Sequence, residues 1–498
     1  MMILRAASFA ALFLFWPFVL AAETVTLSAK DGALIMEGRV LGYDGRYFRL
    51  DTVYGEVTID GRETLCAGLG CPTPTSTKIN LRISGAPSAT SVLLPALVEG
   101  FALRNGYAFA RVNQDATHFN YTLVDGANGA SLIEIGFRIS SSAEGFVDLI
   151  VDEADLVASL RPIRAQEATL EEEAGRGDLT QPGQVTILAL DALVPVVSPQ
   201  SDLTTITLGD LAAAFADPED GQTVHTLARN SGVYELFVDR LLTPENLTPS
   251  DRIVFHDSVG ALANAVLDDP KALGLTVLSG RTGLRQLSMT TDCTMTYETD
   301  LKDLKSGDYP LVAPIYLYRP ARRLPPIMQD FFAYLETPAA QVVVQRAGFV
   351  NQQPDLVPIS VQGTRLMAAI AQAGSEVPLT ELKSVMAKIA GYERLSVTLR
   401  FTGDDLTPRS QTALARLETR ISQGAYANDA LLLTGHTARP GPFATNQAAS
   451  TALAQIIRDR LPPDQSIEVF GAGDAIPAGC EQTALGRSLN RRVEVWVK

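Results

Sequence analysis

The sequence predicts a multidomain α/β protein: a small N-terminal β domain, a larger α/β domain and a C-terminal domain in which strands and helices alternate. Three observations predict this organisation. Asp-Gly turns separate short β-prone runs near the N-terminus, which indicates antiparallel hairpins. From Ile79 to about Val350, β-prone runs alternate with helical patterns, which is typical of parallel sheets with crossover helices. Strand and helix patterns alternate again from Leu395 onward.

The first 22 residues, MMILRAASFAALFLFWPFVLAA, have the pattern of a secretory signal peptide. Arg5 is the lone charge before an uncharged, almost entirely apolar run from Ala6 to Ala22, and small residues at its end suit cleavage near Ala22. A retained membrane anchor is the alternative. The run is short of the ~20 apolar residues that a span requires, and it contains Pro17. We therefore expect an exported protein whose mature chain starts near Glu23.

The charge balance limits the partners. The chain has 41 Lys and Arg residues against 56 Asp and Glu residues, which gives a net charge of −15. A surface this acidic disfavours nucleic acid and anionic lipid as partners. Local basic pockets for small anions remain compatible with this balance.

Four cysteines in an exported chain are candidates for disulfides. Cys66 and Cys71 bracket the short glycine-containing loop CAGLGC, and we expect them to pair. Their spacing is not that of a CxxC redox motif. Cys293 and Cys480 lie far apart in the sequence, so they either pair across domains or stay as free buried thiols.

The domain boundaries follow changes in sequence pattern. Residues 23–75 form the predicted small β domain, and the Pro/Thr-rich stretch CPTPTSTK follows it as a linker. Residues 78–350 form the large α/β domain. Residues 351–390 begin with NQQPDLVPISVQ and continue into helical stretches, which predicts a helical linker. Residues 391–498 form the C-terminal domain.

Three strand-to-helix turns in the large domain have the build of an oxyanion site. A tetrahedral oxyanion needs several convergent N–H and O–H donors, which helix N-termini and hydroxyls supply. The turns are GAPSATS (Gly85 to Ser91), SSSAEGF (Ser140 to Phe146) and ARNSGVYELF (Ala228 to Phe237). One such turn is usually just a helix cap, but three together predict a shared cleft. The predicted ligand-binding residues are Ser88, Thr90, Ser140, Ser141, Arg229, Ser231 and Gly232, with Arg229 as a bidentate clamp.

The same region resembles a known family. LRISGAPSATSVLLPALVEGFA, SSSAEGFVDLIVDEADLVASLRPI, VTILALDALVPVVSP, DYPLVAPIYLY and FFAYLETPAAQVVVQRAGFV follow one another as in the phosphate-type periplasmic binding proteins of ABC importers. The resemblance covers about residues 78–350. It implies two α/β lobes joined by a hinge, phosphate or another small oxyanion in the interlobe cleft, and an ABC permease as partner.

Two positions depart from that family's pattern. Val233 stands where a threonine hydroxyl is usual. Leu160 stands where many phosphate binders place a carboxylate or hydroxyl that accepts from a protonated phosphate. An apolar side chain there removes the acceptor and, with it, the preference for a protonated oxyanion. The alternatives are weakly bound phosphate, another anion, or an empty cleft.

The C-terminal residues resemble a second family. LRFTGDDLTPRSQTALARL, LLLTGHT, IEVFGAGDAIP and GCEQTALGRSLNRRVEVWV are similar to the OmpA-like C-terminal domain, which folds as a β/α sandwich and binds the diaminopimelate residue of peptidoglycan. In that family an aspartate follows GHT and an arginine lies in the next helix. Ala438 and Leu453 occupy these two peptidoglycan-site positions here, and neither can make a charge-assisted bond. The resemblance implies the fold, with a weakened contact to peptidoglycan or outer-membrane components.

The two resemblances together predict a small N-terminal β domain, a two-lobed periplasmic-binding-protein-like α/β domain and an OmpA-like C-terminal sandwich. The sequence contains no GxSxG, HExxH, Walker A or CxxC pattern. No two of the four histidines, His118, His225, His256 and His436, have metal-ligand spacing. We therefore expect no enzyme activity, no metal and no cofactor.

Two functional hypotheses remain. The first is a substrate-binding protein of the periplasm that delivers or senses phosphate or a related oxyanion. The second is a non-catalytic envelope scaffold with a vestigial ligand cleft. Both predict the periplasm or cell envelope of a Gram-negative bacterium, with outer-membrane association through the C-terminal domain.

Overall fold

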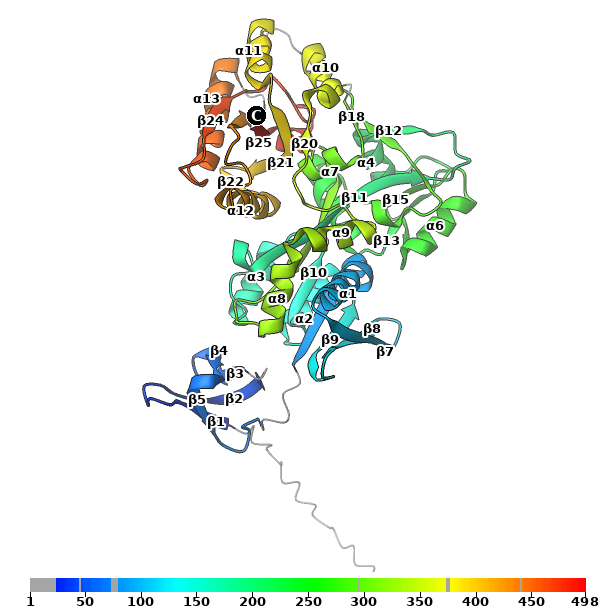
Figure 1. Ribbon diagram of the computed structural model, residues 1–498. Helices are drawn as coiled ribbons and strands as arrows, with labels where there is room; N and C mark the ends of the chain where they lie inside the picture. Colours follow the sequence, from blue (N-terminus) through cyan, green and yellow to red (C-terminus); the bar gives the residue numbers. More distant parts are fainter. Residues whose placement is uncertain (1–23, 44–45, 73–78, 294, 373–376, 439–440) are drawn as a thin grey trace, which may run out of the picture. The chain divides into compact units, whose positions relative to one another are not determined.

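Figure 1 shows the computed structural model of the chain. The structure describes residues 24–43, 46–72, 79–293, 295–372, 377–438 and 441–498. The predicted signal peptide, residues 1–22, lies outside the described residues. Within the described ranges, no helix is both long and apolar enough to cross a membrane. The chain divides into two compact units, Met1–Ile79 and Asn80–Lys498, and each is described by itself.

The first unit is one antiparallel sheet. Its strands are β1 (Thr24–Ala29), β2 (Ile35–Tyr43), β3 (Tyr47–Thr52), β4 (Gly55–Asp60) and β5 (Thr64–Ala67), in the order β4-β3-β2-β1-β5. Consecutive strands from β1 to β4 pair as the expected meander, and β5 pairs with β1. The tight turn from β3 to β4 uses the positive φ of Gly55, +92°, which a glycine adopts without strain.

A small core and a disulfide hold this sheet together. The buried core side chains are Val25, Leu27, Phe48 and Leu50. Cys66 and Cys71 form the expected disulfide, with Cα atoms 5.8 Å apart. So small a sheet buries little apolar surface, and a covalent link adds stability that its core cannot supply.

The second unit begins with lobe 1, which we define as strands β6 to β10 and the helices that pack on them. Its elements are β6 (Asn80–Gly85), η2 (Ser88–Leu93), α1 (Leu94–Arg104), β7 (Tyr107–Asn113), β8 (His118–Asp125), β9 (Ser131–Ile139), α2 (Ser142–Ile150), β10 (Leu156–Ser159), α3 (Ala165–Glu173), α8 (Pro326–Leu335) and α9 (Pro338–Arg346). Strand β6 pairs in parallel with β9 and β10, while β7, β8 and β9 form an antiparallel edge. The ring of Phe101 in α1 meets that of Phe331 in α8 edge-on, 5.4 Å apart, which joins the two helices.

Lobe 2 is the part of the unit between the two connecting strands. Its elements are β12 (Thr205–Thr207), α4 (Leu208–Ala216), β13 (Val224–Leu227), α5 (Gly232–Phe237), η4 (Val238–Leu242), η5 (Thr243–Glu245), β14 (Val254–His256), α6 (Val259–Asp268), β15 (Leu273–Val277), β16 (Arg285–Gln286), β17 (Ser288–Thr290), β18 (Thr296–Tyr297) and α7 (Leu301–Ser306). Strand β13 pairs in parallel with β14 and β15. The expected parallel pairing is therefore present in both lobes.

Two long strands, β11 (Val185–Val197) and β19 (Val312–Tyr318), connect the lobes, and we call them the hinge strands. They pair antiparallel, so the sheet runs β14-β13-β15-β11-β19-β10-β6-β9-β8-β7. The sequence of β11, VTILALDALVPVV, is almost entirely apolar and is buried along its length, as a strand covered on both faces requires. Its register against β19 shifts between Ile187 and Ala189, which marks a β-bulge in the hinge.

The C-terminal domain is built on a second sheet, with the strand order β20-β21-β25-β23-β24. Its elements are β20 (Leu356–Val357), η7 (Ile359–Gln362), α10 (Gly363–Gln372), α11 (Leu379–Ile389), β21 (Glu393–Thr402), β22 (Asp405–Leu406), α12 (Pro408–Ser422), β23 (Leu431–His436), α13 (Phe443–Arg458), β24 (Ile467–Gly471), α14 (Ala484–Asn490) and β25 (Arg492–Val497). The strand and helix alternation expected after Leu395 is present, and α14 is an additional helix.

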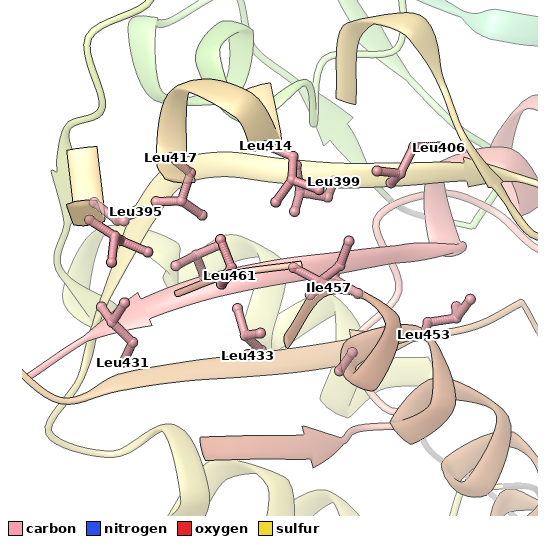
Figure 2. Close-up of a cluster of buried hydrophobic side chains, with 14 of the residues drawn as sticks. Leu395, Leu399, Leu406, Leu414, Leu417, Leu431, Leu433, Leu453, Ile457 and Leu461 are labelled. Atoms are coloured by element: carbon pink, nitrogen blue, oxygen red, sulfur yellow. The ribbon is translucent and has the colours of Figure 1, made fainter. Parts of the chain in front are cut away.

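Helices α12 and α13 cover one face of this sheet. Figure 2 shows the shared core, which includes Leu395, Leu399, Leu414, Leu417, Leu431, Leu433, Leu453 and Ile457. Side chains alternate along a strand, so Leu431 and Leu433 point into this core while Leu432 points to the other face. Leu453, which the sequence placed at the altered peptidoglycan site, is 3% exposed and belongs to this core.

Helices α10 and α11 pack on the opposite face. Val385 and Ile389 of α11 contact a core that contains Leu432 and Trp496 of the sheet. Both faces of the sheet carry large apolar residues, so each needs a helical cover. Residues 351–390, expected as a helical linker, thus include two helices that complete the core of the C-terminal domain.

The C-terminal domain is fixed to lobe 2. Cys293, after β17, forms a disulfide with Cys480, before α14. The carboxylate of Asp308 accepts hydrogen bonds from Arg394 at 2.5 Å and from Arg400 at 3.1 Å. Burial alone would raise the pKa of Asp308, but the neighbouring guanidinium groups hold it well below its usual range. A covalent link and a buried ionic cluster therefore join the same two parts.

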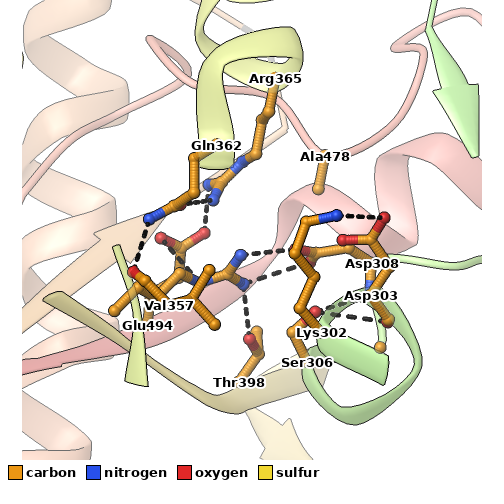
Figure 3. A network of polar contacts seen from close by, with 12 residues as sticks. Lys302, Asp303, Ser306, Asp308, Val357, Gln362, Arg365, Thr398, Ala478 and Glu494 are labelled. Carbon is orange, nitrogen blue, oxygen red and sulfur yellow. Dashed lines mark hydrogen bonds and ion pairs between the residues drawn. The ribbon is translucent and has the colours of Figure 1, made fainter. Parts of the chain in front are cut away.

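A second buried cluster surrounds Glu494 of β25. Its carboxylate, which is fully buried, lies 2.7 Å from Arg492 and 3.5 Å from Arg394. Figure 3 shows Arg365 of α10 reaching the same carboxylate. Burial opposes its charge, but these arginines hold the pKa of Glu494 well below its usual value. Because breaking a buried ion pair is costly, the cluster fixes α10 to the sheet.

Candidate functional site

The first predicted turn begins where β6 ends, in a conformation that requires glycine. Gly85 has a φ of +143°, and a Cβ there would lie 1.9 Å from the carbonyl oxygen of Ala158. The amide of Ala86 donates to the same oxygen at 2.9 Å, which places the start of the helical segment beside β10. The hydroxyl of Ser88 is buried and has no hydrogen-bond partner among the described residues. Thr90 instead donates to backbone carbonyls of its own turn at 3.0 and 3.2 Å.

The second turn caps α2 and meets the first. Ser141 is the N-cap and accepts from a backbone amide of the first helical turn at 3.1 Å. The amide of Ser140 donates to the carbonyl of Gly85 at 2.9 Å. The hydroxyl of Ser142 accepts from the amide of Leu160 at 3.1 Å. These bonds bring the ends of β6, β9 and β10 together.

The third turn belongs to lobe 2 and contacts the second. Ser231 caps α5 by accepting from the amide of Tyr234 at 3.2 Å. Gly232 is buried, and a Cβ there would lie 2.7 Å from the Ser142 hydroxyl oxygen and 2.8 Å from Cβ of Leu160. The two lobes are therefore in direct contact at Gly232, and a larger side chain there would push them apart.

Arg229, the expected clamp, has its partners within lobe 2. Its guanidinium lies 4.5 Å from the ring centroid of Phe255 and 3.7 Å from the carboxylate of Asp251. Its side chain is 57% exposed. The stacking on Phe255 depends on β14, more than twenty residues further along the chain, so the turn's own sequence could not predict it.

Sequence reasoning missed the charged residue that joins the lobes. Arg161 is almost completely buried and pairs with Glu167 of α3 at 2.6 Å and with Glu235 of α5 at 2.7 Å. Burial disfavours its charge, yet the hydrogen bonds that Arg161 donates to these two carboxylates raise its pKa above the ordinary value. Since Glu167 lies in lobe 1 and Glu235 in lobe 2, the guanidinium ties one lobe to the other.

Leu160 occupies the space between the turns. Its side chain is 3% exposed and lies against the position of Gly232. The first turns of α2 and α5 supply backbone amides, and they also carry the carboxylates of Glu144 and Glu235. Backbone amides at helix N-termini can bind an anion.

Two histidines that are distant in sequence meet in lobe 2. Nδ1 of His225 lies 3.0 Å from Nε2 of His256. Burial lowers the pKa of both rings, and the neighbouring ring lowers that of His225 further, so both are neutral near pH 7. No group of three or more His, Cys, Asp or Glu residues in the described parts of the chain is placed to hold a metal ion.

Comparisons by sequence identify no relative. No family model matches the chain. A search of curated proteins finds no match either. Solved structures do match in fold.

The chain is similar in fold to three solved proteins over about half its length. An ABC-type phosphate transport receptor from Vibrio cholerae is 14% identical, with a TM-score of 0.41, and the match covers 54% of this chain and 99% of that one. A putative phosphate ABC transporter substrate-binding protein with bound phosphate from Clostridium perfringens is 15% identical, with a TM-score of 0.41, over 55% and 100%. The periplasmic molybdate-binding protein of Azotobacter vinelandii is 16% identical, with a TM-score of 0.33, over 55% and 100%.

Proposed function

We propose that this protein is an exported solute-binding protein that holds phosphate or a related small oxyanion between lobe 1 and lobe 2. It acts in the periplasm of a Gram-negative bacterium and delivers its ligand to an ABC permease. The observation that carries the proposal is the contact between Gly232 and Ser142. At this contact the N-terminus of α2 in lobe 1 lies next to the N-terminus of α5 in lobe 2. A ligand that binds both lobes requires such an arrangement.

The donors around this contact favour a fully ionised anion. Backbone amides come from α2 and from α5, which η4 extends, and their helix dipoles add partial positive charge. The hydroxyl of Ser88, in the first turn, is buried without a partner among the described residues, and we propose it as a further donor. With Leu160 in place of an acceptor, a protonated oxyanion would leave its own O–H unsatisfied.

Two observations favour the second hypothesis, a non-catalytic envelope scaffold with a vestigial cleft. Leu160 fills the lobe contact with apolar atoms, and the buried Arg161–Glu235 pair holds the lobes together with protein groups. A scaffold needs such a permanent contact, whereas a binding protein needs one that a ligand can join. The two hypotheses therefore differ in whether any anion binds at Gly232.

Calorimetry on the mature chain from Glu23 separates them. We expect one of phosphate, sulfate and molybdate to bind with one site per chain, and Gly232→Val to weaken it at least about tenfold by separating the lobes. Gly260→Val in α6 is the matched control, because a Cβ there has no atom of another residue within 4 Å. Absence of binding for all three anions would support the scaffold instead.

We also propose that residues 391–498 are an OmpA-like envelope-association domain whose contact with peptidoglycan is weakened. A hollow of about 440 Å³ lies at Thr437 and Ala438 and is bordered by Arg487 and Arg491, and no carboxylate is among its lining residues. The ammonium group of a diaminopimelate-type ligand would thus have no ionic partner in this hollow. Leu453 is buried in the core and offers no charge.

Retention on insoluble peptidoglycan tests this second part. Ala438→Asp should raise retention about tenfold or more, because one charge-assisted hydrogen bond contributes ~1.5–3 kcal/mol. Ala425→Asp is the control, since Ala425 is exposed elsewhere on the domain. If the parent protein is retained as tightly as Ala438→Asp, the domain holds the envelope by another surface.

A further inference from the structure

A cavity of about 520 Å³ lies between α12 of the C-terminal domain, the hinge strand β11 and helices α8 and α9 of lobe 1. Its charged lining residues are five cations, Lys305, Arg319, Arg409, Arg416 and Arg420, and one carboxylate, Glu336. This concentration of positive charge contrasts with the net charge of −15 for the chain. We propose that the cavity binds a small linear polyanion, at a site separate from the lobe contact at Gly232.

Helix α12 places three of these cations in one row. Arg409, Arg416 and Arg420 are separated by seven and by four residues, so they share one face of the helix. Leu414 and Ile421, on a different face of the helix, pack into the core of the C-terminal domain. The row is ~16 Å long at 1.5 Å per residue. A linear anion with several charges matches it better than a single tetrahedral ion.

Three of the five cations have no carboxylate within 4 Å in the part of the chain that the structure describes. Arg409 donates to the carbonyls of Leu304 and Lys305 at 3.0 and 2.6 Å, and Arg319 to one backbone carbonyl at 2.8 Å. Nε of Arg420 is buried without a partner among the described residues. Burial lowers the pKa of Arg409 to about 10 and lowers that of Arg319. A bound anion would supply the counter-charge that these guanidinium groups lack.

The other two cations are already paired. Nζ of Lys305 lies 2.6 Å from Asp355, and the guanidinium of Arg416 lies 2.8 Å from Glu336. Arg319 and Arg420 line the cavity from different parts of the chain. They are therefore the residues whose removal should weaken an anion most while disturbing the fold least.

Calorimetry with inorganic tripolyphosphate on the mature full-length protein tests the proposal. We expect one site per chain, with orthophosphate weaker at this site, and at least a tenfold loss of affinity in Arg319→Gln/Arg420→Gln. The charge-matched control is Arg104→Gln/Arg346→Gln, two exposed arginines of lobe 1, which should bind as the parent does. If the first double variant does not fold, Arg420→Gln alone should show a several-fold loss.

The outcomes also separate this site from the lobe contact. Gly232→Val should leave tripolyphosphate binding unchanged even if it abolishes oxyanion binding between the lobes. The proposal is overturned if the parent binds no tripolyphosphate or if both double variants lose affinity equally. It is also overturned if Gly232→Val removes the tripolyphosphate site while the cavity variant keeps it.

Discussion

The guanidinium of Arg416 donates a 3.0 Å hydrogen bond to the carbonyl oxygen of Ile187. Arg416 belongs to α12 of the C-terminal domain, whereas Ile187 lies at the β-bulge of the hinge strand β11. The same guanidinium pairs with Glu336 at the end of α8. One side chain thus connects the C-terminal domain, the hinge and lobe 1, at a point where the strand ladder is interrupted.

We expect Arg416→Ala to loosen the lobes at little cost in global stability. Glu336 is half exposed, and Gln352 also donates to the Ile187 carbonyl at 2.5 Å, so that oxygen keeps a partner. The free energy of unfolding should fall by about 1 kcal/mol or less. Distances between spin labels on lobe 1 and lobe 2, measured by electron–electron double resonance, should spread more widely. In the control Glu336→Gln, Arg416 keeps its bond to Ile187, so the label distances should spread less than in Arg416→Ala. An unchanged distance distribution in Arg416→Ala would show that the contact does not restrain the hinge.

Truncating Leu160 should exchange stability for ligand affinity. Because its side chain is 3% exposed, Leu160→Ala should lower the free energy of unfolding by about 2–3 kcal/mol, measured in urea. The space opened beside the N-termini of α2 and α5 should strengthen oxyanion binding in calorimetry. Leu156, in β10, is equally buried, and Leu156→Ala should lose stability without gaining affinity. Equal behaviour of the two variants would exclude Leu160 from the ligand site.

Glu171 of α3 should make stability fall as the pH rises. It is fully buried, and both carboxylate oxygens lack hydrogen-bond partners among the described residues. Burial raises its pKa to about 8 from 4.5. Between these values the folded state holds a proton that the unfolded state releases, so the free energy of unfolding decreases with rising pH. Glu171→Gln should remove this slope and stabilise the protein at pH 8 by on the order of 2 kcal/mol, because an uncharged amide avoids the cost of a buried carboxylate. The prediction is wrong if the free energies of unfolding of parent and variant, measured in urea, change by the same amount between pH 5 and pH 8.

Removing the disulfide between Cys293 and Cys480 should weaken the junction of lobe 2 with the C-terminal domain. The bond closes a loop of 187 residues, and the loss of a native disulfide typically costs about 2–5 kcal/mol. Cys293→Ser/Cys480→Ser should therefore lower the thermal midpoint of unfolding under non-reducing conditions. The control, Cys66→Ser/Cys71→Ser, changes only the N-terminal unit. If both double variants leave this midpoint unchanged, the ionic clusters hold the junction without help from the disulfide.

Local sequence patterns predicted the elements whose conformation depends on residues close to one another in the sequence. The Asp-Gly turns indicated the N-terminal meander, because turn conformation depends on the turn residues themselves. The apolar runs around Leu432 and Val495 indicated buried strands for the same reason. Helix α14 was missed because its seven residues carry no long periodic pattern.

The candidate site was less predictable because its decisive contacts are long-range. Arg161 and Glu235 are 74 residues apart, and His225 and His256 are 31 apart. Serine and threonine are suited equally to capping a helix and to binding an anion, so the sequence cannot distinguish these roles. In the structure Ser231 caps α5, whereas Ser88 keeps a buried hydroxyl without a partner among the described residues.

Because the C-terminal domain is attached to lobe 2, lobe 1 is the part that can move relative to both. The Cys293–Cys480 disulfide and the ion pairs of Asp308 make these two parts one body. If that body were anchored in the envelope, it would stay fixed, and lobe 1 would be the part that rotates about the hinge strands. A partner that responds to ligand binding would then have to contact lobe 1, because lobe 1 would be the part that changes position.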